Sequence, residues 1–315
     1  MRRTYVSLTT ENYHYLALWL IKSLQRFSNL DINIFCINYH PKDSGLEMPS
    51  DVGFHRIEYE IFEEGEDFQD SGSGNFYVNR KNLRSFQVLS RKSEACLKAM
   101  EMGYDEVCFI DGDSIACPNI DEIFDYANGI EFTPLLTKGP HEFVMVPDDD
   151  GVMRGNPFEG CWPECDLTKT LEWPLMQFLQ LRPEDRGEYR TTNVFLVNKS
   201  CENFLIKLDK LLDVMWRIVD VYYYAPFQDE TPTNVLIWKY GGGGLPMSYI
   251  NINDGYKTVK HFFETEVEQD TLSGDFYKIP KDKNLIKVLH GEKREQELGK
   301  IIQHLDKLKE KGYYN

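Results

Sequence analysis

One stretch constrains the fold more than any other: a short apolar run, residues 107–110, ends directly in Asp111-Gly112-Asp113. An uninterrupted apolar run of this length is typical of a strand that is buried on both faces of a sheet. Glycine lets the backbone turn sharply, so we expect the two aspartates side by side. Carboxylates this close need a cation between them, or one of them must hold a proton. Oxygen ligands that leave positions open suit Mg²⁺ or Mn²⁺, which take waters and substrate phosphates as further ligands.

An isolated Asp-x-Asp is more often a polar turn than a metal site, because the pattern is common. The context favours a metal site here, since a hydrophobic strand precedes the triplet and Pro118 and residues 121–124 (Asp-Glu-Ile-Phe) follow closely. The whole segment resembles the metal-binding segment of nucleotide-sugar glycosyltransferases with the GT-A fold. In that family, strand, Asp-x-Asp and "Pro-x-x-Asp-Glu-Ile/Leu-Phe" occur together. The resemblance is strongest to the family-8-like branch, which includes glycogenin and bacterial sugar transferases.

The start of the chain indicates the fold class. Residues 4–8 predict a strand, residues 13–27 carry apolar side chains at helical spacing, and residues 32–37 predict a second strand. Such a β-turn-α-β opening is typical of an α/β protein with a parallel sheet. Together with the resemblance, it predicts a GT-A-type α/β fold, in which helices flank a mixed, mainly parallel sheet.

The length of 315 residues fits one large domain with an ample core. The resemblance implies a single catalytic domain, with residues 1–130 as the nucleotide-binding half and residues 131–291 as the acceptor- and sugar-binding half. The C-terminal part, 292–315, contains a predicted charged amphipathic helix over 292–311. Residues 38–80 are rich in Pro, Gly, Ser and acidic side chains and are predicted to be mostly loop.

The rim of the predicted sheet offers candidate nucleotide contacts. Ligands of parallel sheets bind beyond the carboxyl ends of the strands, which places Thr9, Thr10 and Tyr13 at such a rim. They resemble the family's "strand-Ala-Thr-x-x-x-Tyr" start, which holds base and ribose, but helix capping by Thr10 and core packing of Tyr13 explain them equally well. In similar enzymes a basic residue about one helix before the Asp-x-Asp strand faces the donor phosphates. Here that residue is Arg91 or Lys92.

A polar turn that runs into an apolar strand, residues 189–198, resembles the family's segment that holds the donor sugar and acceptor. The resemblance implies that Thr192 and Asn193 bind the donor. The sequence departs from the family here, because Thr191-Thr192-Asn193 stands where Asn-Ser-Gly is usual. Residues 201–224, after this strand, predict a long amphipathic helix.

Asp229-Glu230, followed by Asn234, resembles the family's "Asp-Gln-x-x-x-Asn" helix start. The resemblance implies that Asp229 caps the helix and reaches sugar hydroxyls. It also places Glu230 near the anomeric carbon, where retaining enzymes usually carry glutamine. A carboxylate there can stabilise an oxocarbenium-like centre or attack it, so both acidic residues are candidate catalytic groups. The alternative is a pair of acidic residues that the helix dipole favours at an N-terminus.

A second strong signal lies near the end of the chain, where an apolar run over 285–289 leads into His290 and Gly291, with Lys293 beyond. Imidazole can complete the coordination of a divalent metal by two aspartates. Gly291 allows a phosphate to approach backbone N–H groups, and Lys293 can neutralise a leaving diphosphate. The segment resembles the family's "His-Phe/Tyr-x-Gly-x-x-Lys", with a shorter spacing that leaves Arg294 as a substitute. A single histidine at a strand end is usually structural, but the acidic triplet favours a ligand.

Composition excludes several classes of protein. The hydrophobic fraction of 42% and the aromatic fraction of 13% indicate a folded globular chain. The net charge of -16 argues against nucleic acid as a partner and against a polybasic membrane anchor. Seven scattered cysteines, including Cys161 and Cys165, predict reduced thiols. Residues 1–25 lack the apolar run of a signal peptide or transmembrane helix, so we expect a cytoplasmic protein with no transmembrane segment.

The order of these motifs gives one main hypothesis, a metal-dependent glycosyltransferase of the hexosyltransferase type. It would move a sugar from a nucleotide-diphosphate donor to a glycan or other hydroxyl acceptor. Mn²⁺ or Mg²⁺ would be held by Asp111, Asp113 and His290, and would draw off charge as the glycosidic bond breaks. A UDP-sugar donor and retention of the anomeric configuration are implied by the resemblance alone. A homodimer is left open.

Two alternatives stay open. Asp111-Gly-Asp113-Ser-Ile115 loosely fits the Asp-x-Asp-x-Thr/Val loop of haloacid-dehalogenase-like phosphatases, in which the first aspartate is the nucleophile. That loop normally lies near the start of a chain and is followed by Gly-Thr, and neither holds here. The other alternative is a catalytically silent nucleotide-sugar-binding protein.

Overall fold

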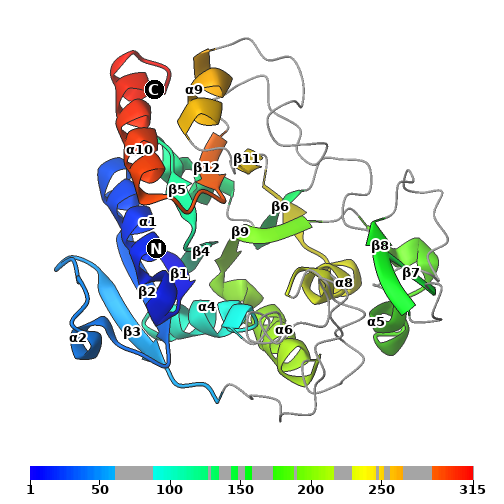
Figure 1. Cartoon of the computed structure of the whole chain (residues 1–315). Coiled ribbons are helices and arrows are strands. Elements are labelled where there is room, and N and C mark those ends of the chain that lie inside the picture. The colour runs from blue at the N-terminus through cyan, green and yellow to red at the C-terminus, as the bar shows by residue number, and fades with distance from the viewer. Residues whose placement is uncertain are drawn as a thin grey trace.

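The computed structural model shows three layers, a central sheet with helices on both of its faces (Figure 1). It describes residues 1–60, 88–126, 129–134, 143–147, 153–157, 173–187, 190–215, 229–245, 248–251, 256–264 and 286–314. Within these ranges we find no helix with the length and apolar character needed to cross a bilayer.

The central sheet has seven strands in the order β10-β6-β9-β4-β1-β2-β3. Their bounds are β1 Arg3–Thr9, β2 Asp31–Ile37, β3 Gly53–Ile57, β4 Glu106–Ile110, β6 Ile130–Pro134, β9 Arg190–Asn198 and β10 Gly243–Gly244. β9 runs antiparallel to both of its neighbours, β4 and β6, and every other pair is parallel. The predicted α/β class, with a mixed but mainly parallel sheet, is therefore confirmed.

Two hydrophobic layers cover the sheet because successive strand residues point to opposite faces. In β4, Cys108 and Ile110 pack on one side, whereas Val107 and Phe109 pack on the other. The first layer is formed with α1 His14–Phe27, α9 Tyr256–Glu264 and α10 Glu295–Glu310. The second is formed with α4 Lys92–Glu101, α6 Glu202–Met215 and α8 Glu230–Tyr240.

A smaller sheet brings the end of the chain back to its middle. Its order is β11-β12-β5, with β5 Ser114–Ala116, β11 Ser248–Asn251 and β12 Ile286–His290. β12 runs antiparallel to β5, and His290 pairs with Ser114. Since Ser114 directly follows Asp113, this register alone places the imidazole of His290 beside the acidic triplet.

The remaining elements are short. They are the 3-10 helices Glu11–Tyr13, Ile120–Tyr126, Pro183–Asp185 and Lys199–Cys201, the helices α2 Pro41–Ser44 and α5 Trp173–Phe178, and the paired strands β7 Phe143–Pro147 and β8 Met153–Pro157. α2 and β3 lie within 38–80, and the other described residues of this segment, 38–40, 45–52 and 58–60, form no helix or strand, in agreement with its predicted loop-rich character. The parallel pairing of β3 with β2, rather than a local signal, makes that strand.

Most predicted elements are found within a few residues of their expected bounds. The helix predicted over 201–224 runs from Glu202 to Met215, and residues 216–224 lie outside the described ranges. The helix predicted over 292–311 begins later, at Glu295. Cys36, Cys96, Cys108, Cys117 and Cys201 are free thiols, whereas Cys161 and Cys165 lie outside the described residues. One sheet joins strands from both expected halves of the chain, and the proposed division at residue 130 stays a prediction.

Candidate active site

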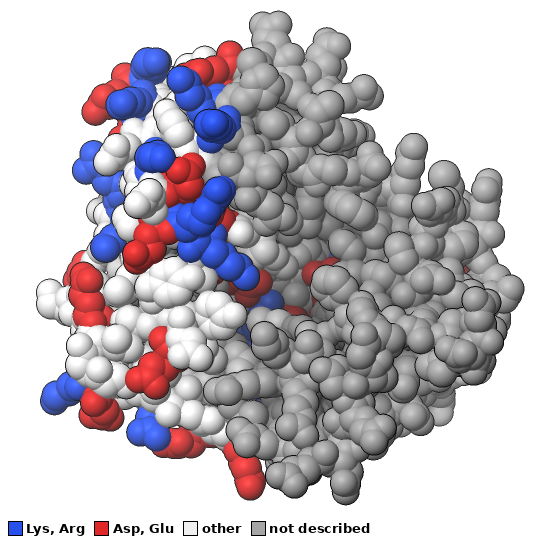
Figure 2. Space-filling view, viewed as in Figure 1, with Lys and Arg blue, Asp and Glu red and all other residues white. Residues whose placement is uncertain are grey.

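The sheet has a topological switch point between β1 and β4. From β1 the chain adds β2 and β3 on one side, and β4 then pairs with the other side of β1. A switch of this kind opens a crevice beyond the carboxyl ends of the two strands, where open α/β sheets bind ligands. Thr9 ends β1 and Asp111 follows β4, so both lie at this edge. Figure 2 shows a hollow with acidic and basic side chains in the area where Figure 1 places β4 and β9.

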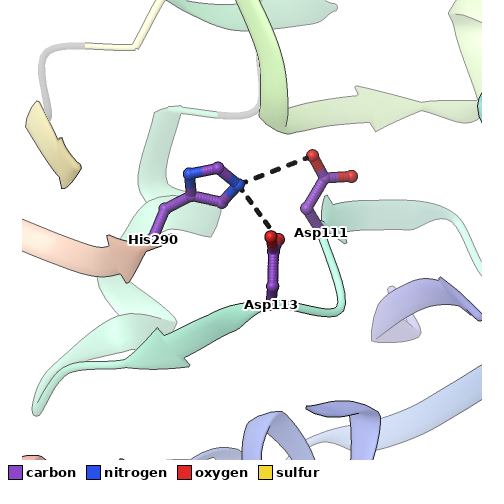
Figure 3. A group of neighbouring side chains, drawn as sticks. All are labelled: Asp111, Asp113 and His290. Carbon is purple, nitrogen blue, oxygen red and sulfur yellow. Dashed lines mark ion pairs between the residues drawn. The ribbon is translucent and has the colours of Figure 1, made fainter. Parts of the chain in front are cut away.

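Three side chains from this edge converge (Figure 3). Nε2 of His290 lies 3.0 Å from Oδ1 of Asp113 and 4.0 Å from Oδ2 of Asp111. One ligand atom from each of the three residues lies within 4.8 Å of the others. All three side chains are partly shielded from solvent, between 15% and 20% exposed. The spatial meeting that the sequence predicted is therefore present.

Gly112 and Gly291, the two glycines beside the cluster, are required for different structural reasons. Gly112 does not have a positive φ; instead, a Cβ on it would lie 3.3 Å from the carbonyl oxygen of Leu8. The backbone of the acidic loop thus packs directly on β1, and that close approach explains the glycine. Gly291 has φ of 103°, and its N–H donates to the carbonyl oxygen of Asp113 at 3.0 Å. This N–H is therefore engaged within the protein, and the close approach of a phosphate to other backbone N–H groups here stays a prediction.

Replacing Gly291 with alanine is expected to lower the free energy of unfolding by about 1–3 kcal/mol, because a φ of 103° is strained for any residue with a Cβ. Denaturant unfolding of both proteins in EDTA measures the difference. Equal midpoints and slopes would show that the His290–Gly291 turn does not need its left-handed backbone.

Arg91 and Lys92, the two basic candidates at the start of α4, face different neighbours in the structure. Nζ of Lys92 lies 3.0 Å from Oδ1 of Asp111 and 3.2 Å from Oδ2 of Asp229, and Lys92 is only 4% exposed. Arg91 faces the other way, toward Asp209 and Asp213 of α6. Of these two basic residues, Lys92 is therefore the one that contacts the acidic cluster.

Electrostatics in the cluster follow from burial and neighbouring charge. Burial raises the pKa of Asp111 to about 6, even though the ammonium of Lys92 pulls it down. Burial also opposes ionisation of Asp113, but His290 and Lys293 outweigh it and hold the pKa of Asp113 well below its usual range. Burial alone would lower the pKa of His290, yet the carboxylate of Asp113 raises it. The neighbouring carboxylates therefore favour the protonated form of His290 in the metal-free protein.

Asp229 and Glu230 stand at the start of α8, both buried. Asp229 holds the N-cap position, but its side chain makes no capping hydrogen bond and instead pairs with Lys92, so the expectation of a side-chain cap was wrong. Burial and then the charge of Asp229 raise the pKa of Glu230 to about 8. The N–H of Thr192 donates to its carboxyl group, and the hydroxyl of Thr191 shares a hydrogen bond with it. Asn234 fixes this arrangement by bridging the backbone N–H and C=O of Arg190 at the start of β9.

Changing Glu230 to glutamine is expected to stabilise the metal-free protein increasingly as the pH rises. Between pH 4.5 and about 8 the folded protein keeps a proton that the unfolded chain has released, so the stability that Glu230 contributes is full below pH 4.5 and is lost as pH passes 8. Glutamine avoids that loss. The gain should be small at pH 5, reach about 4 kcal/mol near pH 8 and then level off.

Unfolding of the two proteins from pH 5 to pH 9 measures this gain, and Glu101→Gln, at an exposed glutamate, is the control. A Glu230→Gln gain that does not change with pH would mean that Glu230 is ionised in the folded protein throughout.

The residues predicted to hold the nucleotide lie at the rim of the same edge. Thr10 precedes the first 3-10 helix with an extended backbone but no side-chain cap, and Thr9 is buried. Tyr13 is 53% exposed, which rules out core packing, and Nζ of Lys293 lies 5.9 Å from the centre of its ring. Nζ of Lys293 is also 3.5 Å from Oδ2 of Asp113. Arg294 pairs with Glu292 instead, so it does not replace Lys293 in these contacts.

Sequence reasoning missed Thr191. Its hydroxyl lies between Glu230 and Asn193, 2.7 Å from Oδ1 of Asn193. Asn193 in turn places its amide nitrogen 2.9 Å from Nε2 of His290. Strand alternation would have found this link, because residues two apart on a strand share a face.

The residues present fit a divalent cation. Two carboxylates and an imidazole whose ligand atoms lie within 4.8 Å of one another are a donor set for Mn²⁺ or Mg²⁺. Burial raises the pKa of Asp111 and the carboxylate of Asp113 raises the pKa of His290, so both groups favour their protonated forms in the metal-free site.

No protein-family model matches the sequence, and no curated protein matches it. Among solved structures, the chain is similar to the crystal structure of a galactosyltransferase, LgtC, in complex with donor and acceptor sugar analogs. The match has 14% sequence identity and a TM-score of 0.48, and it covers 98% of this chain and 95% of that chain. At this level of similarity two chains need share neither activity nor substrate.

Proposed function

We propose that this protein is a metal-dependent glycosyltransferase of the GT-A type that uses a nucleotide-diphosphate sugar. The observation that carries the proposal is the meeting of Asp111, Asp113 and His290 at the switch point of the sheet. Residues separated by more than 170 positions form one donor set where α/β sheets bind ligands. The order of motifs along the chain supports the same assignment.

Asp111, Asp113 and His290 are the residues that would hold the cation. When bound, a divalent cation there supplies a Lewis acid that stabilises the charge of a leaving diphosphate. Lys293 is 57% exposed in its side chain, so its ammonium has room to move from Asp113 onto a phosphate. Lys92 is buried and fixed between Asp111 and Asp229, which suits a preorganised positive charge rather than a mobile one.

The sugar would lie against the start of α8, where Asp229 and Glu230 meet the Thr191-Thr192 segment of β9. Buried carboxyl groups in this position can accept hydrogen bonds from sugar hydroxyls. In its protonated form Glu230 can also donate one, and in its ionised form it can stabilise positive charge at the anomeric carbon or attack it. Retention of the anomeric configuration is part of the proposal on the resemblance alone.

The proposed donor is a UDP-sugar, with Thr9, Thr10 and Tyr13 at the nucleotide end of the site. Tyr13 offers an exposed ring at the rim, which can stack on a base, and Lys293 lies between it and the metal ligands. A glycan or another hydroxyl compound would be the acceptor. The path from ring to cluster matches the order of base, diphosphate and sugar in the donor.

A thermal-shift panel tests the proposal. UDP, GDP and ADP, together with UDP-glucose, UDP-galactose and UDP-N-acetylglucosamine, are each added with Mn²⁺ or with EDTA. We expect a uridine compound to raise the melting temperature only in the presence of Mn²⁺, followed by release of UDP from one of the sugars. If no nucleotide stabilises the protein in a metal-dependent way, the transferase assignment fails.

The same panel separates the two alternatives. Release of inorganic phosphate from phosphomonoesters, with no response to nucleotide sugars, would favour a phosphatase. Metal-dependent stabilisation without any turnover, even with added glycan acceptors, would favour a silent binding protein.

A further inference from the structure

We propose that the side-chain amide of Asn193 is a fourth protein ligand of the cation held by Asp111, Asp113 and His290. This inference rests on the proposed function only in assuming that a divalent cation binds at this cluster. It gives the site an uncharged oxygen ligand from the middle strand of the sheet. The sequence family that the chain resembles usually has glycine at this place, so the ligand is a property of this chain.

The backbone fixes Asn193 opposite the first aspartate. β4 and β9 are antiparallel, with Ile110 paired to Val194, and the N–H of Asp111 donates to the carbonyl oxygen of Asn193 at 2.9 Å. Residues directly opposite in an antiparallel pair project from the same face, with Cβ atoms about 5 Å apart. The amide of Asn193 is therefore aimed into the cluster by the register of the central sheet, not by a loop.

The distances fit octahedral coordination. With bonds of about 2.1 Å, neighbouring ligand atoms lie about 3 Å apart and opposite ones about 4.2 Å apart. Measured from Nε2 of His290, Oδ1 of Asp113 is at 3.0 Å and the amide nitrogen of Asn193 at 2.9 Å, both the spacing of neighbours. Oδ2 of Asp111 is at 4.0 Å, close to the spacing of opposite ligands.

The amide lies beside the ring of His290 rather than in line with either nitrogen. Its nitrogen is 2.9 Å from Nε2 and 3.3 Å from Nδ1, whereas an in-line hydrogen bond to one would leave the other much farther away. The contact is thus a poor hydrogen bond. The 2.9 Å between the amide nitrogen and Nε2 is, however, the spacing expected of two neighbouring metal ligands.

Turning the amide by 180° brings its oxygen to this position at little cost. Oxygen and nitrogen of an asparagine amide are nearly the same size and exchange places on such a turn. The hydroxyl of Thr191 now donates to Oδ1 of Asn193 at 2.7 Å, and after the turn it would accept from the amide NH₂. Its proton then goes to the carboxyl group of Glu230, with which it already shares a hydrogen bond.

A double-mutant cycle on Mn²⁺ affinity tests the ligand. Binding of Mn²⁺ alone, without nucleotide, is measured by electron paramagnetic resonance of the free ion for wild type, Asn193→Ala, His290→Ala and the double variant. We expect Asn193→Ala to weaken binding about tenfold, the size of effect typical of groups around a metal. We also expect a clear weakening in the His290→Ala background, because a ligand acts on the cation directly and not through the imidazole. Asn198→Ala, at the other end of β9, is the control and should bind as wild type does.

The outcomes separate the inference from the function it rests on. If Asn193→Ala weakens binding in wild type but not in the His290→Ala background, Asn193 only positions the imidazole and the inference is overturned. Unchanged binding in Asn193→Ala overturns it as well, with the metal site itself intact. If wild type does not bind Mn²⁺, the metal centre and the proposed function fail together. Should Asn193→Ala not fold, Asn193→Asp serves instead. Its carboxylate should raise the affinity severalfold, and an equal or lower affinity would count against the ligand.

Discussion

Replacing Lys92 with methionine is expected to lower the free energy of unfolding of the metal-free protein by about 3 kcal/mol at pH 7. The ammonium of Lys92 is buried between Asp111 and Asp229, at 3.0 and 3.2 Å. Although burial alone would lower it, these two carboxylates raise the pKa of Lys92, so the amine is charged at every working pH. Methionine keeps the packing of the alkyl chain but leaves both carboxylates buried without a counter-charge.

Protonation limits the loss. The pKa of Asp111 is already about 6, so without Lys92 this aspartate takes up a proton near neutral pH rather than staying charged. The destabilisation should therefore be smaller at pH 5 than at pH 8. Lys98→Met, at a 40% exposed lysine on the same helix, should change stability by no more than about 0.5 kcal/mol. Equal losses for the two variants would mean that the Lys92 contacts contribute nothing beyond those of a surface lysine.

The central part of the site could be predicted from the sequence because each ligand follows an apolar strand. Such runs mark buried strands, and a polar residue at the end of one lies at a sheet edge. That reasoning placed Asp111, Asp113 and His290 correctly relative to their own strands. It could not measure the distance between them, because the pairing of β12 with β5 depends on contacts between distant parts of the chain.

Other features of the site depend on which neighbour a side chain meets. Arg91 and Lys92 are adjacent and both buried, and only the position of α6 decides that Arg91 pairs there while Lys92 faces the acidic site. Asp229 similarly has the residue type and position of a helix cap, but a buried ammonium is a stronger partner than a backbone N–H. Gly112 was attributed to a turn, whereas its reason is the carbonyl of Leu8 on another strand.

These placements share one electrostatic consequence. Within the described part of the site, four acidic side chains lie close to one another, Asp111, Asp113, Asp229 and Glu230, and two of them have raised pKa values. Lys92 is the cation that joins the metal ligands to the start of α8. Because Lys92 contacts both Asp111 and Asp229, a divalent cation bound beside Asp111 would change the electrostatics at the start of α8.

Changing Asp113 to asparagine is expected to reduce turnover of the nucleotide sugar selected by the thermal-shift panel by at least about 100-fold. A loss of about 100-fold is the largest typically seen for residues that only support metal ligands, and Asp113 is proposed as a ligand itself. The variant should stay folded, with a loss of about 2 kcal/mol for its ion pair with His290. The loss is limited because His290 can release its proton once the carboxylate that raises its pKa is gone.

Two readouts make this result specific. The pKa of His290, followed by NMR in EDTA, should fall in Asp113→Asn. The negative charge of Asp113 is the largest influence that raises this pKa against burial. Asp125→Asn, at an exposed aspartate in the 3-10 helix that follows β5, should change neither turnover nor that pKa. Full turnover in a folded Asp113→Asn protein that has lost Mn²⁺ binding would show that the reaction does not need the metal ligands, and the assignment of this edge as the catalytic site would have to be abandoned.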